Sequence, residues 1–84
     1  MEYSELYVQR IRTLCKQRNI SINKLATMSG VRQSTLDNIA RGLTKAPRAA
    51  TLHKIANAFN MTLSEFLDFE ELNDYIFPDE SDDL

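Results

Sequence analysis

Residues 21–42 read SINKLATMSGVRQSTLDNIARG, and this stretch decides the fold of the 84-residue chain. Ser21 is a suitable N-cap and therefore predicts the start of a short helix over residues 22–29. Gly30 stands where a left-handed residue can end that helix. The apolar pattern that follows predicts a second helix over residues 33–41. We therefore expect two short helices joined by a tight turn.

Two short helices with such a turn form the helix-turn-helix pattern, and the small side chains of this stretch suit it. Ala26 lies on the face of the first helix toward the second, where a large side chain would prevent close crossing. Val31, in the turn, can fill the gap below the crossing of the two helices. The second helix is then free to expose one face, most of whose members carry amide or guanidinium groups suited to base edges. We expect this reading face to consist of Gln33, Ser34, Asn38 and Arg41.

The rest of the chain also has helical spacing. Apolar residues recur at intervals of three and four over residues 4–18 and 49–59, which predicts a helix in each range. Thr62 and Glu65 form a T-x-x-E capping box that predicts a fifth helix from about residue 63. No segment shows sustained alternation with period two, so we expect an all-α, compact five-helix domain.

The composition excludes several classes of protein. Hydrophobic residues make up 43% of the chain and charged residues 26%, which fits one small globular domain rather than a disordered chain. The longest stretch without a charged side chain is the ten residues between Lys54 and Glu65, and a membrane helix needs about 18. The N-terminal residues do not show the pattern of a secretory leader. We therefore expect a cytoplasmic protein with no membrane partner.

Neither a metal site nor a catalytic site is expected. Cys15 and His53 are the only cysteine and histidine, too few for an ordinary structural zinc site. Cys15 falls on an apolar stripe and is expected in the core, whereas His53 is expected at or near the surface. No strained nucleophile turn or Gly-rich phosphate loop accompanies the histidine, so we expect no enzyme activity and no cofactor.

Charge is distributed unevenly along the chain. Residues 1–67 hold all ten Lys and Arg and only four acids, a net charge of +6, whereas residues 68–84 hold eight acids and no base. The overall charge of −2 therefore hides a basic body. Because fields act over a Debye length of about 8 Å, this body can still attract a polyanion. We expect a domain over residues 1–69 and an acidic C-terminal extension over residues 70–84.

The motif resembles that of the lambda-repressor-like, Cro-type (XRE family) helix-turn-helix regulators, over about residues 5–69. The segments LTKAPRA and TLHKIANAFNMTLSEFL match the family's loop and last two helices. The matching motif residues are Leu25, Ala26, Gly30, Val31, Gln33, Ser34, Leu36, Ile39 and Gly42. The resemblance implies sequence-specific binding of double-stranded DNA, with the second motif helix in the major groove, by a transcriptional regulator that acts as a repressor.

The resemblance also implies residue roles. Gln33, Ser34 and Asn38 occupy base-contact positions, and Arg41 shares their face. One departure is Arg32, which stands where the family often has a Ser or Thr cap and offers no side-chain acceptor. Because Asn and Gln can pair bidentately with adenine, we expect adenine in the half-site, whereas neighbouring Asp37 is not expected to be a main contact. The expected phosphate contacts are Ser21, Arg32, Thr44, Lys45 and Arg48.

The C-terminal segment combines acids with bulky apolar residues. Three such residues in a row, 75–77, are unfavourable in water, so we expect them to pack on the body or on another subunit. Members of the family commonly dimerise through C-terminal helices, which implies a homodimer on a palindromic site. We expect the last seven residues, PDESDDL, to be disordered. The expected dimer contacts are Phe66, Leu67, Tyr75, Ile76 and Phe77.

Two alternatives stay open. In one, the acidic segment folds back onto the basic surface and weakens DNA binding. In the other, the chain is a protein-interaction module such as an antitoxin or an adaptor. A DNA binder should lose affinity steeply with salt, which separates it from the second alternative.

Overall fold

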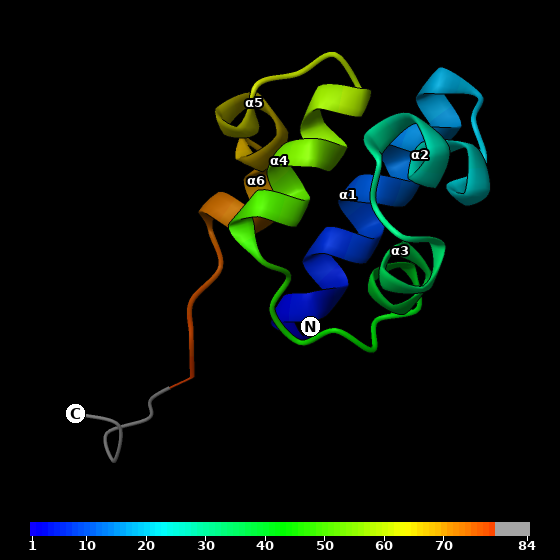
Figure 1. The fold of residues 1–84 in the computed structure, drawn as a ribbon. Helices are drawn as coiled ribbons and strands as arrows, with labels where there is room; N and C mark the ends of the chain where they lie inside the picture. The colour runs from blue at the N-terminus through cyan, green and yellow to red at the C-terminus, as the bar shows by residue number, and fades with distance from the viewer. Residues whose placement is uncertain (79–84) are drawn as a thin grey trace.

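The computed structural model describes residues 1–78, and in this range all regular structure is helical (Figure 1). In the view of Figure 1 the longest helix, α1, appears between α2 and α3 on one side and α4, α5 and α6 on the other, and α2 also packs directly against α4. The helices are α1 Tyr3–Arg18, α2 Ile22–Ser29, α3 Gln33–Ala40, α4 Ala49–Ala58, α5 Leu63–Leu67 and α6 Glu70–Asn73. No helix among the described residues is both long enough and apolar enough to span a bilayer.

The predicted all-α fold is confirmed, and the five predicted helices are present with ends that agree to within one residue wherever an end was predicted. The sixth helix, α6, was not predicted. It is a single turn of four residues between acidic neighbours, too short to show a periodic pattern. Its Leu72 nevertheless packs against the core. The expectation of disorder at the chain's end falls on residues 79–84, which lie outside the described residues, and on Pro78, which is exposed.

Local signals set the helix ends. Ser21 caps α2, because its Oγ accepts a hydrogen bond from the Lys24 amide at 3.0 Å. Gly30 ends α2 with a φ of +73°, a conformation in which any Cβ would be strained. The predicted capping box of α5 is also present. The Thr62 amide donates to Glu65 Oε1 at 2.8 Å, and the Glu65 amide donates to Thr62 Oγ1 at 3.1 Å.

The core lies where the first five helices meet. Each of them contributes a side chain with no exposed surface, namely Ile11, Leu25, Leu36, Ile55 and Phe66. Ala26 and Val31 are buried as the motif predicts, and so is Cys15, whose thiol pKa is raised by burial. The expectation that Phe66 lies at a dimer contact is corrected here, because a side chain buried in the monomer has no surface to offer a partner.

Three arginines of α1 donate to backbone carbonyls at the C-terminal ends of other helices. The last four carbonyls of a helix have no partner within it, and the helix dipole makes this end negative. A guanidinium group at this end therefore donates a hydrogen bond to an unpartnered carbonyl and places a positive charge beside the negative end of the helix. The contacts are Arg10 Nε to Phe66 O at 2.9 Å, Arg10 Nη2 to Glu65 O at 3.0 Å, Arg12 Nη2 to Ala40 O at 3.0 Å and Arg18 Nη1 to Phe59 O at 2.6 Å.

In α3, all of the last four carbonyls have a hydrogen-bond donor. Three of its last four carbonyls accept from the backbone amides of the residues that follow the helix. The fourth, that of Ala40, accepts from Arg12 of α1. Every carbonyl of the last turn thus has a donor, and α3 is joined to α1 at the end of the helix as well as through the core.

We expect Arg10→Met to lower the free energy of unfolding by about 2 kcal/mol, since a charged donor to two carbonyls is lost. Its guanidinium also lies over the Phe69 ring, with 5.0 Å from Cζ to the ring centroid. Urea denaturation measures the change. Lys16→Met, which replaces an exposed cation of the same helix, should stay within about 0.5 kcal/mol of the wild type. Equal effects of the two substitutions would contradict this role for Arg10.

The capping box makes stability depend on pH. Hydrogen bonds from the Thr62 amide and hydroxyl lower the pKa of Glu65, so the folded state favours the carboxylate. This stabilisation is present above pH 4.5, the ordinary pKa, and is lost as the pH falls through the lowered value. Glu65→Gln should therefore lose less stability on acidification than the wild type, as followed by thermal unfolding. Glu5→Gln, which removes an exposed acid from α1, should keep the wild-type response.

Candidate nucleic-acid interface

Helix α3 turns one face to the core and the other to solvent. Its apolar residues, Leu36, Ile39 and Ala40, are buried. All members of the predicted reading face are exposed, namely Gln33, Ser34, Asn38 and Arg41. The first three stand on the helix itself, and Arg41 is its C-cap. These four polar residues are therefore accessible on α3 from its first turn to its C-cap.

The side chain of Gln33 is held in place from both sides. Its Nε2 donates to Asn23 Oδ1 of α2 at 2.7 Å and to Asp37 Oδ1, one turn further along α3, at 2.8 Å. The contact with Asn23 joins the two helices of the motif above their apolar crossing. The most N-terminal member of the reading face is thus fixed before any ligand is present.

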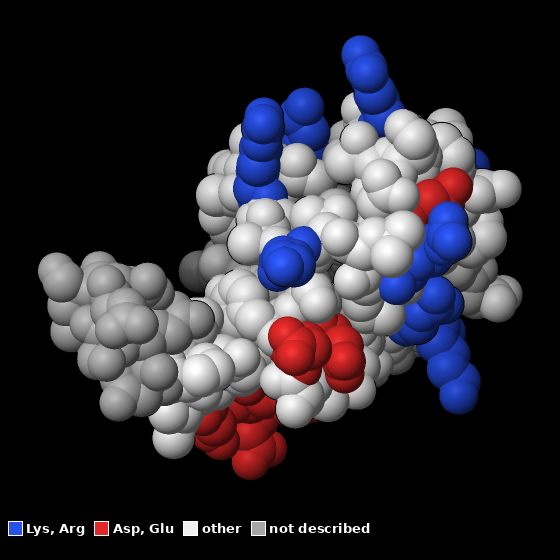
Figure 2. Space-filling view, turned by 90° about the horizontal axis from the view of Figure 1, so that it is seen from below, with Lys and Arg blue, Asp and Glu red and all other residues white. Residues whose placement is uncertain are grey.

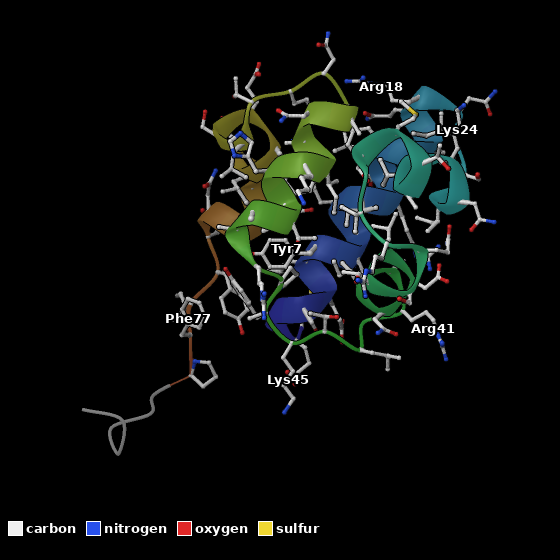
Figure 3. The ribbon with its side chains drawn as sticks, viewed as in Figure 1. Tyr7, Arg18, Lys24, Arg41, Lys45 and Phe77 are labelled. Carbon is white, nitrogen blue, oxygen red and sulfur yellow. The ribbon has the colours of Figure 1, made fainter. Side chains whose placement is uncertain are left out.

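The loop between α3 and α4 folds back beside α3. Thr44 and Arg48 of the loop line a hollow of about 350 Å³ together with Thr35 of α3 and Thr51 of α4. Lys45 is exposed, and Figure 3 shows its side chain and that of Arg41 extending outward at separate points along the lower edge of the molecule. Two of the predicted phosphate contacts, Thr44 and Arg48, therefore adjoin α3, and Lys45 extends into solvent.

Both α3 and α4 have an arginine at the N-cap position whose side chain forms no capping hydrogen bond. These residues are Arg32 and Arg48. The amides of these first turns are left without a side-chain partner, next to an exposed guanidinium. Such a helix start favours an anion. Ser21 differs, because its oxygen already caps α2, although its hydroxyl proton can still be donated.

Positive charge is concentrated on the motif. Residues 21–48 carry five cations and one acid, Asp37, whose carboxylate accepts from Gln33. The five cations, all exposed, are Lys24, Arg32, Arg41, Lys45 and Arg48. Figure 2 shows Lys and Arg along the upper and right-hand parts of the view, and Asp and Glu both in its lower part and beside the cations on the right. On this face the cations therefore lie mostly apart from the acids of the lower part.

The C-terminal strip, residues 75–77, is partly packed on the body. Tyr75 and Phe77 both lie against Tyr3 of α1, with ring centroids 5.2 and 5.0 Å away. Ile76 between them is 87% exposed and Phe77 is 63% exposed. Leu67 is half-buried at the end of α5. The strip thus has a fixed inner side and an apolar outer side.

The described residues offer little for other chemistry. They contain no group of three or more His, Cys, Asp or Glu that could hold a metal ion. His53 is exposed on α4, as expected. What the arrangement can do is present amides, hydroxyls and cations to a large anionic surface.

One residue that contacts the predicted reading face was not predicted from the sequence. Asn23 stands in the first turn of α2, ten residues before Gln33, and no local pattern relates the two. This contact depends on the crossing geometry of α2 and α3, which periodicity does not specify. The hydrogen bond between Gln33 and Asp37 joins residues four apart on one helix, so helical spacing alone can predict it.

Comparison with known proteins gives related sequences and folds. The model of the helix-turn-helix family HTH_3 matches residues 11–66. Two relatives in Bacillus subtilis (strain 168) are the HTH-type transcriptional repressor RghR, 33% identical over 57 residues, and the HTH-type transcriptional regulator SlrR, 37% identical over 62 residues. These matches cover 68% and 74% of this chain but only 42% and 41% of the relatives. The chain therefore spans less than half the length of these curated relatives.

Two solved structures share the fold. The crystal structure of the prophage Lp1 protein 11 superposes with a TM-score of 0.78 at 29% identity, covering 89% of this chain and 100% of that one. The crystal structure of an HTH_3 family transcriptional regulator from Vibrio cholerae gives a TM-score of 0.69 at 30% identity, covering 86% of this chain and 38% of that one.

Proposed function

This chain belongs to the HTH_3 family of helix-turn-helix proteins, and we propose that it binds double-stranded DNA sequence-specifically as a transcriptional repressor, with α3 in the major groove. The observation that carries the proposal is the presence of five exposed cations in residues 21–48, the same segment that carries the exposed polar face of α3. Repression is the form of regulation proposed because RghR, one of the relatives, is described as a repressor.

Phosphates would set the register of the protein on the duplex. The free amides at the starts of α3 and α4, each beside an arginine, supply two such positions. Thr44 and Lys45 in the loop and Ser21 at the start of α2 supply further donors. The exposed members of the reading face, Ser34 and Asn38 among them, then contact base edges.

We also propose a homodimer formed through the outer side of the C-terminal strip. Ile76 and Phe77 expose apolar surface that a second copy would cover. Stacking on Tyr3 holds this surface in place, which lowers the entropy cost of association. Leu67 and Tyr75 are the proposed flanking contacts. A two-fold dimer would place its two α3 helices in major grooves about 34 to 36 Å apart on a palindrome.

Binding to DNA should weaken steeply with salt. Each phosphate contact contributes a slope of about −0.9 in log affinity against log salt concentration. Lys45→Ala and Arg48→Ala should each reduce the slope by about one per half-site, as measured by fluorescence anisotropy over a range of salt. Because Lys16 lies on α1, outside the motif, Lys16→Ala should leave the slope nearly unchanged. A shallow wild-type slope, unaffected by either loop substitution, would favour a protein-interaction module instead.

The proposed dimer is tested by sedimentation. Wild-type protein at high micromolar concentration should sediment as a dimer, and Ile76→Asp should raise the dissociation constant at least about tenfold because a charge replaces a contact in an apolar interface. Leu43→Asp places the same charge at another exposed apolar position, in the α3–α4 loop, and should not change association. A wild-type protein that is monomeric both free and on DNA would contradict the dimer.

A further inference from the structure

The hydrogen bonds of Gln33 fix which of its amide atoms can meet a base. A carboxylate only accepts, so the Gln33 atom 2.8 Å from Asp37 Oδ1 must be the amide nitrogen. The same nitrogen lies 2.7 Å from Asn23, which must therefore present its oxygen. The orientation of both amides thus follows from Asp37 alone.

This assignment uses the whole donor capacity of Gln33. An amide nitrogen carries two protons, and here one goes to Asn23 and the other to Asp37. The oxygen, Oε1, is the atom of the Gln33 amide left for a ligand. Gln33 is exposed and opens α3, so this oxygen belongs to the part of the helix expected nearest the bases.

We propose that Asn23 and Asp37 are positioning residues that make Gln33 an acceptor-only reader of bases. This inference rests on the proposed function. A bidentate pair with adenine needs the glutamine to donate to N7 and accept from N6. Both protons of the Gln33 amide nitrogen are already donated to Asn23 and Asp37, so the bond to N7 cannot form. What remains is acceptance from an amino group in the major groove, which adenine and cytosine offer and guanine and thymine do not. The position read by Gln33 should therefore accept A or C and reject G and T.

Asp37 then has a role that its charge alone does not suggest. A carboxylate near DNA repels phosphate, but here it holds the amide that meets the base. Removal of its acceptor oxygens frees one Gln33 proton. The freed proton can be donated to N7 of a purine. The position read by Gln33 should then also accept guanine, and its preference for adenine over cytosine should increase.

The experiment selects bound duplexes from a random pool with five proteins: wild type, Gln33→Ala, Asp37→Ala, Asp37→Asn and Asp74→Ala. The position read by Gln33 is the one whose preference Gln33→Ala abolishes. Wild type should disfavour G there on the order of fivefold to tenfold, the worth of one hydrogen bond. Asp37→Ala should reduce this discrimination to about twofold or less.

Two variants separate the hydrogen bond from the charge. Asp37→Asn removes the same charge but keeps an oxygen that can accept from Gln33, and it should retain the wild-type preference. Asp74→Ala removes an exposed acid from the C-terminal segment and should change overall affinity at most. The selection thus reports base preference, which a merely structural role for Asp37 would not move.

The possible outcomes are distinct. Preference for G or T at this position in the wild type, or the same preference in wild type and Asp37→Ala, overturns the inference while DNA binding stands. Failure of the wild type to enrich any sequence overturns the proposed function and the inference with it. A base preference at this position that broadens in Asp37→Ala but not in Asp37→Asn supports both the proposed function and the inference.

Discussion

Carbonyl oxygens at the ends of short helices are the constraint on which this structure depends. In a helix of eight residues such as α3, half of the carbonyls lie in the last four positions and have no partner within the helix. A small domain cannot afford to leave them unsatisfied beside its core. Arg10, Arg12 and Arg18 of α1 reach the ends of α5, α3 and α4, so one long helix supplies donors to three short ones. The apolar core and these contacts together fix how the short helices lie around α1.

The candidate interface follows from that arrangement. Since α3 is held by its buried side chains and by Arg12 at its end, its other face is free to stay polar and exposed. The α1 arginines are directed at main-chain oxygens, whereas the exposed cations of the motif and its loop have no such contact in the described structure. Two kinds of cation therefore coexist in the basic body. The first kind stabilises the fold, and the second gives the motif side its charge.

Sequence reasoning succeeded where a signal is local. Ser21, Gly30 and the Thr62–Glu65 box mark helix ends through their own backbone geometry, and the apolar spacing identifies the buried faces. It failed where the relation is between distant residues. The arginines of α1 were counted only in the net charge of the basic body, Asn23 had no assigned role, and Phe66 was placed at a dimer contact although it lies in the core. Periodicity shows which side of a helix is apolar, but not which neighbour meets its polar side.

The arginine contacts also bear on how such a domain can change over evolutionary time. Each guanidinium binds a main-chain oxygen, a group that every amino acid provides regardless of its side chain. Substitutions on the exposed side of α3 therefore leave the anchor at its end unaltered. The exposed residues of α3 can therefore diverge among related proteins while the arrangement of the helices stays the same.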